Sequence, residues 1–435
     1  MQILITLVFS APKTCEFGFP RSLTHNDSVQ SSTANKRGAE KYLLCGISTS
    51  LWAVYDINIP DITIPINLGA TQMDFTLSEM KIANLDVPDL KMNLNANEQA
   101  DIFLPNVNIQ LNFAWKFQQQ QYPYVNDHGT GRLNINNAVM SATCKSALDN
   151  ECPGHMTIQI IKTTMEYDQL RIKLEGGQSW IFQSLLDVIL DSLQNQITDF
   201  MSNTLMGGFV GLMNGAFEDG RRQKTLLTDQ NIIKDERYVD KVQVGNGYIS
   251  LMFSGYTYLG SNLTDEYLKS GTSPITMNKF NAEMQMAVKD EAFNNVNYIF
   301  HKYYDSYSGK DFKTINQPKL RFTNTGALVT MLVEANETQV EIELFAKPKL
   351  FDDLSKVVGR ISFEYQAYSI DTAEGLNAEA LLNQVVQHMN EVAEQTGFQY
   401  NYALMVDIRD FQPIFDANER VMRLVGDLPK ECLPY

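Results

Sequence analysis

Residues 107–117 read Val-Asn-Ile-Gln-Leu-Asn-Phe-Ala-Trp-Lys-Phe, a run in which the odd-numbered side chains are all large and apolar. Side chains of a β-strand point alternately to the two faces of a sheet, so this period of two predicts a strand with one buried and one wet face. A usual strand has ~5 to 6 residues. The length of the run therefore predicts an extended or strongly coiled sheet.

Similar alternation on both sides of this run predicts more half-buried strands. They are expected within 57–68 and 73–77, then at 133–142, 156–167 and 170–174. Turn-forming sequences at 67–69, 87–89 and 126–129 separate the runs at hairpin spacing. This half of the chain is thus predicted to form an antiparallel sheet.

After Gly176 and Gly177 the apolar period changes from two to three or four, which predicts an amphipathic helix over 179–205. Glycines between 207 and 215 are expected to loosen its end. Such a helix needs an apolar surface to lie against, so its apolar side is the first candidate lining of a lipid pocket: Phe182, Leu185, Leu186, Ile189, Leu193 and Ile197.

The second half of the chain repeats this plan more faintly. Strands are predicted at 248–258, 320–322, 328–333, 340–344 and 361–365, and closing strands at 399–406 and 421–425. Between them lies a second amphipathic helix, with Gly397 placed to end it. Its apolar side is the second candidate pocket lining: Leu381, Leu382, Val385, Val386 and Met389. The repetition indicates a weak internal duplication in architecture.

The composition indicates a folded protein that does not bind nucleic acid. The chain has 435 residues, of which 44% are hydrophobic and 20% charged, which is ordinary for globular domains. Thirty-five basic against 51 acidic residues give a net charge of -16, and residues 1–255 alone carry 19 basic and 26 acidic residues. This acidity argues against binding that depends on neutralising phosphates. No run reaches the ~20 apolar residues of a transmembrane helix.

The amino-terminal residues 1–11 are short, apolar and end in small side chains, which is typical of a secretory signal, although no basic residue precedes the run. The alternative is a buried terminal strand. Residues 12–40 are predicted to be a flexible segment. Glycosylation sequons at Asn26, Asn262 and Asn336 agree with a secreted or lumenal protein. Cys144 and Cys152 are spaced to close a hairpin loop by a disulfide, or are two free thiols.

Known catalytic and metal-binding patterns are absent from the sequence. It contains no Gly-x-Ser-x-Gly elbow, His-Glu-x-x-His helix, phosphate-binding loop or Cys-x-x-Cys pair, and its five histidines are isolated. We therefore expect no enzyme activity, metal or cofactor. Met201, Met206 and Met213 either line an adaptable pocket or belong to the core. Trp115 and Trp180 are expected in the core rather than at a membrane interface.

The pattern resembles the bactericidal/permeability-increasing protein and lipopolysaccharide-binding protein family. The resemblance rests on Ile57–Asp61, the alternating run to Phe117, Gly131–Ile135 and the helix from Ser179, and on segments 248–256, 275–300 and 381–424 of the second half. It implies an α+β fold of two elongated tubular barrels in a boomerang. Each barrel is a coiled antiparallel sheet around a long helix, and a central sheet joins them. The implied boundaries are 41–255, including central-sheet strands, and 256–435.

The resemblance implies a secreted or lumenal protein that binds phospholipid, sterol or a similar amphiphile in apolar pockets and contacts membrane surfaces transiently. Two departures matter. The chain is acidic where bactericidal relatives are cationic, so tight lipopolysaccharide binding is not expected. The predicted first helix also lacks the cysteine of the family disulfide. Alternatives are a protein that keeps the fold for innate defence or partner binding without lipid transfer, a hydrolase with a dispersed site, and a transmembrane β-barrel.

Overall fold

The fold is that of a computed structural model, and its described part divides into two compact units. The described residues are 28, 30–55, 59–68, 71–95, 98–122, 124–150, 152, 154–179, 186–217, 223–227, 232–245, 247–259, 275, 281–353, 358–371, 375–396, 398–401 and 411–428. Unit 2 holds residues 40–146 and 158–216, and unit 1 holds the residues below 40, 147–157 and those from 217 onward. Between residues 28 and 428 the chain therefore passes from one unit to the other at 39/40, 146/147, 157/158 and 216/217.

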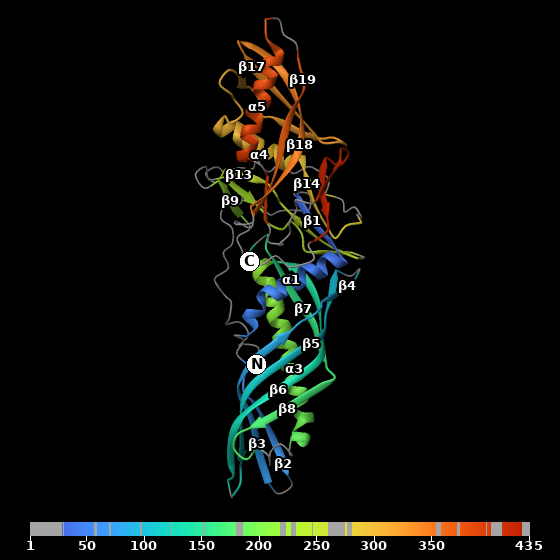
Figure 1. The fold of residues 1–435 in the computed structure, drawn as a ribbon, viewed down its shortest axis with the longest axis vertical. Coiled ribbons are helices and arrows are strands. Elements are labelled where there is room, and N and C mark those ends of the chain that lie inside the picture. Colours follow the sequence, from blue (N-terminus) through green and yellow to red (C-terminus); the bar gives the residue numbers. More distant parts are fainter. Residues whose placement is uncertain are drawn as a thin grey trace. The chain divides into compact units, whose positions relative to one another are not determined.

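Unit 2 is built on an antiparallel sheet of long strands (Figure 1). Its order is β2-β3-β5-β6-β7, with β4 also paired to β5 and β8 to β6. The strands are β2 (Ile62–Leu68), β3 (Thr71–Asp86), β4 (Lys91–Asn95), β5 (Gln99–Gln119), β6 (Asn126–Leu148), β7 (Met156–Glu166) and β8 (Gln169–Glu175). The strand expected over 107–117 is confirmed and is longer than its apolar run, because it continues to Gln99 on the amino-terminal side.

Irregularities in the pairing explain how such long strands fit one sheet. The register shifts between Ser78 and Lys81 of β3 and between Leu104 and Val107 of β5. Glu79, Asn106 and Asn137 adopt positive φ angles of 52°, 58° and 55° at or beside these shifts. A β-bulge bends its strand and increases the right-handed twist. The bulges therefore coil the sheet, as the strand length predicts.

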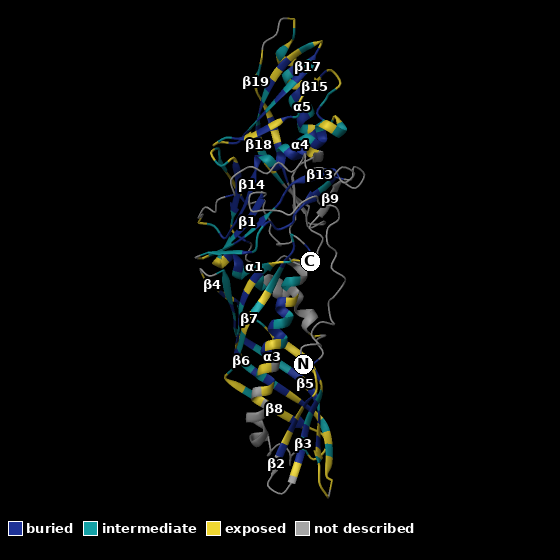
Figure 2. Ribbon diagram, turned by 180° about the vertical axis from the view of Figure 1, so that it is seen from behind, coloured by how far each residue is buried: buried dark blue, intermediate teal, exposed yellow. Residues whose placement is uncertain are grey.

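Helix α3 (Leu186–Phe217) runs beside this sheet in Figures 1 and 2. The helix is predicted correctly, but the expectation that glycines loosen it after 206 is wrong. A glycine costs a helix ~1 kcal/mol relative to alanine. Met206, Phe209 and Val210 are buried in the same turns, and burial of each large apolar side chain is worth ~1.5–3 kcal/mol. Tertiary burial therefore outweighs the local preference.

The segment predicted to be flexible, 12–40, is ordered over the part that the structure describes. Residues Gln30–Asn35 form strand β1, and helix α1 (Lys36–Tyr55) follows at once. Asn35 caps this helix, since its side-chain oxygen accepts a hydrogen bond from the N–H of Gly38 at 2.8 Å. Gly38 leaves no room for a side chain, because a Cβ there would lie 2.2 Å from the carbonyl oxygen of Glu283. The prediction is therefore wrong for residues 30–40.

The described strands of unit 1 form three antiparallel sheets. The first has the order β11-β12-β1-β14-β22-β21, and its strands are β11 (Gln243–Gly245), β12 (Tyr248–Phe253), β1, β14 (Met284–Lys289), β22 (Val421–Gly426) and β21 (Gln412–Asp416). The second is β13 (Thr257–Leu259), β10 (Ile232–Asp235) and β9 (Gln223–Leu227). The first sheet joins segments near residues 30, 250, 286 and 424, and so ties the start of the chain to its end.

The third sheet of unit 1 has the order β15-β17-β18-β19-β20, with β16 paired to β17. Its strands are β15 (Lys313–Thr314), β16 (Lys319–Phe322), β17 (Ala327–Ala335), β18 (Thr338–Asp353), β19 (Val358–Ile370) and β20 (Phe398–Asn401). Helices α4 (Asp290–Tyr304) and α5 (Ala378–Thr396) belong to this part of the chain. The strands predicted from 320 to 365 and the second amphipathic helix are confirmed, and α5 ends directly before Gly397.

The units differ from the predicted domains in two stretches. Residues 147–157 and 217–255 were expected in the first barrel, and the described parts of both lie in unit 1. Of the helices in the described residues, none is long and apolar enough to cross a membrane.

Candidate functional site

The inner face of the unit 2 sheet is continuously apolar. From residue 107 of β5 onward the side chains alternate strictly, and those at 107, 109, 111, 113, 115 and 117 are at most 4% exposed. Cross-strand partners on β6 continue the face, since Ile109 lies opposite Ile135 and Leu111 opposite Leu133. Figure 2 shows this alternation as blue and yellow bands along the strands. The sheet thus provides a long water-excluding surface.

Helix α3 contributes a second buried apolar surface in unit 2. Its buried side chains recur at three to five residues: Ile197, Met201, Leu205, Met206, Phe209 and Val210. Of the predicted pocket residues, Ile197 is 2% exposed, whereas the side chains of Leu186, Ile189 and Leu193, and all of Phe182 and Leu185, lie outside the described residues. Burial of Met201 and Met206 agrees with both a pocket and a core role; Met213 is half-buried.

Polar side chains hold α3 along the edge strand β7. The carboxamide of Asn214 accepts a hydrogen bond from the N–H of Ile158 at 2.6 Å and donates one to the carbonyl oxygen of the same residue at 3.0 Å. Thr163 donates to Asn203 at 3.1 Å. Residue numbers rise along the helix as they fall along the strand, so helix and strand are antiparallel. Among the described strands β7 pairs only with β6, so the Asn214 carboxamide takes the place of a further strand.

The same contact occurs twice in unit 1. Asn390 of α5 pairs with the N–H and C=O of Tyr365 at 2.8 and 3.0 Å, beyond the part of β19 that β20 covers. Asn294 of α4 pairs with the N–H and C=O of Leu320 on β16 at 2.7 Å each. We call these three contacts the asparagine clamps. The clamp on α3 holds the edge strand β7, whereas the clamp on α5 holds β19, which pairs with β18 and in part with β20.

The apolar side of α5 is only partly as predicted. Leu381, Val385 and Met389 are 4%, 0% and 1% exposed and form a buried stripe. Leu382 and Val386 are half-buried and lie beside this stripe. The helix packs on β19, where the hydroxyl of Ser362 donates to the carbonyl oxygen of Ala393 at 2.6 Å.

Aromatic side chains fill part of each unit. In unit 2 the rings of Phe75 and Phe117 have centroids 4.5 Å apart, and Trp115 lies 5.9 Å from Phe117. Trp115 is fully buried, and its indole N–H donates to the carbonyl oxygens of Thr130 and Glu175 at 2.9 and 3.2 Å. The core position expected for this tryptophan is confirmed; Trp180 lies outside the described residues.

In unit 1 the buried Phe293 lies 5.9 Å from Phe322 and 5.0 Å from Phe363, ring to ring, and Phe322 lies 5.6 Å from Phe415. Rings at these separations pack edge to face or tilted and leave little space between them. This part of unit 1 is therefore filled by its own side chains.

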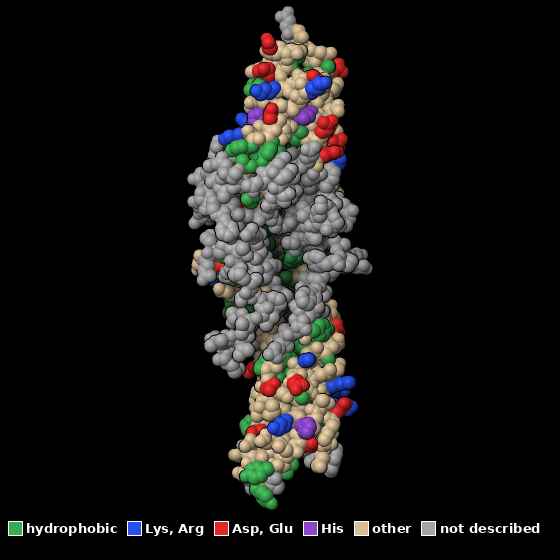
Figure 3. Space-filling model, turned by 90° about the vertical axis from the view of Figure 1, so that its left-hand side faces the viewer, with side chains coloured by type: hydrophobic (Ala, Val, Ile, Leu, Met, Phe, Trp, Pro, Cys, Tyr) green, Lys and Arg blue, Asp and Glu red, His purple; other side chains and the backbone are tan. Residues whose placement is uncertain are grey.

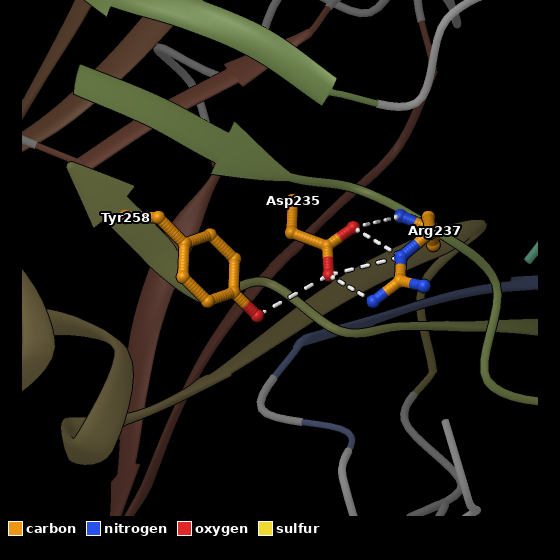
Figure 4. Close-up of polar contacts among 3 residues, drawn as sticks. All are labelled: Asp235, Arg237 and Tyr258. Atoms are coloured by element: carbon orange, nitrogen blue, oxygen red, sulfur yellow. Dashed lines mark hydrogen bonds and ion pairs between the residues drawn. The ribbon is translucent and has the colours of Figure 1, made fainter. Parts of the chain in front are cut away.

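A buried ionic cluster lies in the second sheet of unit 1 (Figure 4). The carboxylate of Asp235 accepts hydrogen bonds from Arg237 at 3.0 to 3.2 Å, and the hydroxyl of Tyr258 lies 3.5 Å away. Burial raises the pKa of Asp235, and the Arg237 guanidinium opposes this by favouring the charged form. Burial and the nearby carboxylate raise the pKa of Tyr258. A Cβ on Gly154 would lie 2.5 Å from Arg237, so this cluster also supports the β6–β7 turn.

The predicted Cys144–Cys152 disulfide is wrong. Cys144 is a free thiol on β6 and is 5% exposed, and burial raises its pKa to about 11. The hairpin closes later, where the N–H of Asp149 donates to the carbonyl of His155. Five residues of extended chain separate Cys144 from Asp149, or ~16 Å at ~3.3 Å each, whereas disulfide Cα atoms lie within ~7 Å. Cys152 is disulfide-bonded to a different cysteine.

Two further sets of predicted sites are placed by the structure. Asn336 is exposed at the two-residue turn between β17 and β18, while Asn26 and Asn262 lie outside the described residues. Within the described residues, no three His, Cys, Asp or Glu side chains gather in a way that could hold a metal ion.

Unit 2 thus combines a coiled antiparallel sheet that has one apolar face with a long helix that also has a buried apolar side. Residues 43–209 match the LBP / BPI / CETP family, N-terminal domain. This match confirms, over those residues, the resemblance predicted from the sequence. The family domain suggests that the protein binds lipid.

One solved structure supports the fold. The crystal structure of lipopolysaccharide binding protein has a TM-score of 0.60 at 11% identity, and the match covers 92% of this chain and 99% of that one. At this identity the likeness concerns the fold alone. P47 of Clostridium botulinum E1 matches with a TM-score of 0.28 at 11% identity over 94% and 100% of the two chains. Takeout 1 of Epiphyas postvittana gives 0.24 at 12% over 39% and 85%. No curated protein sequence matches the chain.

Sequence reasoning missed the asparagine clamps. The only signal in the sequence is that Asn390 directly follows Met389 of the buried stripe, which places a polar side chain beside the apolar side of the helix. Its partner is backbone, which has no sequence signature. The strand that each asparagine holds could therefore not be predicted.

Proposed function

We propose that the protein is a secreted or lumenal carrier that sequesters or transfers phospholipid, sterol or a similar amphiphile. The observation that carries this proposal is the apolar face of the unit 2 sheet together with the buried face of α3, in a domain that matches a lipid-binding family. Burial of each CH₂ is worth ~0.8 kcal/mol, so a 16-carbon acyl chain could gain roughly 12 kcal/mol before ordering costs. Apolar lining alone is sufficient for such binding, with no catalytic group or cofactor.

The charge of the chain bears on the ligand. Its net charge of -16 disfavours ligands whose recognition depends on several phosphates. We therefore propose ligands held by their apolar part, with a zwitterionic or uncharged polar part. Tight lipopolysaccharide binding is not part of the proposal.

The test is native mass spectrometry with organic extraction of the purified full chain, followed by uptake of a labelled phospholipid and a labelled sterol. We expect co-purified lipid, or saturable uptake. Ile197→Asp places a charge on the buried side of α3 and should abolish both. Gln196→Asp makes the same change on the neighbouring exposed residue and should preserve both.

Folding failure is the obvious alternative explanation for the Ile197→Asp result. Ile197→Trp keeps the site apolar but occupies more of the interior, so it should reduce lipid content in a protein with native circular dichroism. Absence of lipid in the wild-type protein, together with no uptake of either probe, would disprove the carrier function.

A second candidate function is that of a partner-binding protein that has kept the fold and binds no lipid in one or both units. The packed phenylalanine rings of unit 1 favour this for the C-terminal part. If lipid content falls with Ile197→Trp but is unchanged by Val385→Met in the α5 stripe, then lipid binding is confined to unit 2.

A further inference from the structure

The turn between β5 and β6 exposes a compact group of large apolar side chains. Tyr122, Tyr124 and Val125 are 85%, 65% and 45% exposed. The two tyrosines are the most exposed large hydrophobic side chains of the described residues, followed by Tyr368 at 62%. Figure 2 shows the end of this hairpin as exposed, and Figure 3 shows hydrophobic side chains gathered at the same end of unit 2. We call these three residues the tyrosine tip.

The tyrosine tip is an ordered turn. The N–H of Gln119 donates to the carbonyl oxygen of Val125, and the N–H of Tyr124 to that of Gln121, both at 2.9 Å. Tyr124 adopts a positive φ of 54°, a conformation that tyrosine rarely takes. The two rings lie edge to face with centroids 6.3 Å apart. These contacts hold the rings outward at the end of two strands of 21 and 23 residues, away from the apolar interior.

The tip also lacks charge. Residues 117–126 read Phe-Gln-Gln-Gln-Gln-Tyr-Pro-Tyr-Val-Asn, with no ionisable acid or base other than the tyrosines, in a chain that is 20% charged. The acidic groups nearest to it are engaged. Asp74 accepts a hydrogen bond from the side chain of Gln120, and Asp127 accepts from the N–H groups of His128 and Gln178 at 2.9 and 2.7 Å. Transfer of residues 117–126 from water therefore buries no ionised side chain.

We propose that the tyrosine tip docks into the headgroup region of an electroneutral lipid surface of the phosphatidylcholine type. Tyrosine suits this layer, because its ring is apolar and its hydroxyl stays hydrogen-bonded. Attraction to anionic lipid needs basic side chains near the surface. Lys116 is the basic residue flanking the tip in sequence, and the chain as a whole is strongly acidic. Docking rests on the proposed carrier function, for which it would bring the protein to the surface that supplies or receives the amphiphile.

The experiment measures co-sedimentation of the full chain with phosphatidylcholine vesicles at physiological salt. Tyr122→Ser/Tyr124→Ser should lower vesicle partitioning at least ~10-fold, since two half-inserted rings account for about 1.4 kcal/mol or more. Tyr368→Ser removes a similarly exposed tyrosine from β19 in unit 1 and should leave partitioning unchanged. Tyr124→Trp should retain binding and show a blue shift of tryptophan emission when vesicles are added.

Four outcomes would overturn the proposal: unchanged partitioning of the double variant, an equal loss with Tyr368→Ser, a Tyr124→Trp emission that stays water-exposed on vesicles, or binding that requires anionic lipid and disappears at high salt. A change in self-association without a change in vesicle binding would also overturn it, by assigning the tip to a protein contact. Lipid content measured by extraction separates this proposal from the carrier function. The double variant should retain its lipid, because the tip lies outside the apolar interior.

Discussion

The asparagine clamp between α3 and β7 makes a specific prediction for the variant Asn214→Ala. The change removes two hydrogen bonds to Ile158 and leaves one N–H and one C=O of an edge strand without their protein partner. A lost hydrogen bond costs ~0.5–1.5 kcal/mol, and more where the group left behind is buried. Since Ile158 is half-buried, we expect a total loss of about 1–3 kcal/mol.

Two measurements check this loss. A unit of 150–250 residues loses ~2–4 °C in Tm per kcal/mol, so the transition of unit 2 should fall by roughly 2–12 °C. Hydrogen exchange is more local, because it reports opening of individual segments. Protection of the β7 amides around Ile158 should fall by roughly 5- to 140-fold, since each factor of 10 corresponds to about 1.4 kcal/mol.

The matched control is Asn203→Ala on the same helix, which loses a single exposed side-chain contact to Thr163. This variant should change stability by less than ~0.5 kcal/mol. Asn214→Asp should be no better than Asn214→Ala, because a carboxylate accepts from the N–H of Ile158 but cannot donate to its carbonyl oxygen. If Asn214→Ala and Asn203→Ala have equal effects on β7 exchange, the clamp does not close this edge and the reasoning is refuted.

Three further predictions concern buried groups. Cys144 should resist alkylation in the native protein at pH 8 and react fully after unfolding, because burial raises its pKa to about 11. Mass spectrometry measures the labelling, and rapid labelling of the native protein would contradict the burial of this thiol. Asp235→Asn should lower the free energy of unfolding by ~3–5 kcal/mol, since it removes the carboxylate that pairs with the buried Arg237. The double variant Asp235→Asn/Arg237→Met should recover part of this loss, and urea titration measures the free energy of unfolding of both variants. Gly129→Ala should destabilise unit 2 by ~1–3 kcal/mol, because the new Cβ would lie 2.2 Å from the carbonyl oxygen of Glu175 and 2.8 Å from Trp115 Nε1. An unchanged Tm would show that both the backbone of β8 and the indole can shift.

The sequence predicted those parts of the fold in which one side of an element is buried and the other is wet. The strand around residues 107–117 and the helix α5 have such patterns, and both were placed within a few residues. Strand β1 was missed because its Gln-Ser-Ser-Thr-Ala-Asn sequence has no apolar alternation. It is buried on both sides by its neighbours, and Thr33 and Ser250 satisfy each other through a 2.9 Å hydrogen bond.

The candidate site was predicted less completely than the fold. Ile197, Leu381, Val385 and Met389 were placed correctly on buried helix faces, because helical periodicity determines which side chains share a face. The clamps join a side chain to backbone, and the tyrosine tip depends on where a turn ends in space. Both are properties of the three-dimensional arrangement, which periodicity in the sequence does not report.

The repeated passage of the chain between the two units has a consequence for modularity. Because the chain changes unit at 39/40, 146/147, 157/158 and 216/217, no single cut between residues 40 and 216 separates the two units. A fragment that ends at residue 255 would keep β1 and β12 but lose β14, the other neighbour of β1. Either half, produced alone, would expose strand edges that the intact chain pairs. We therefore expect that the two units fold only as parts of one chain, unlike domains that follow one another along a chain and can be produced separately.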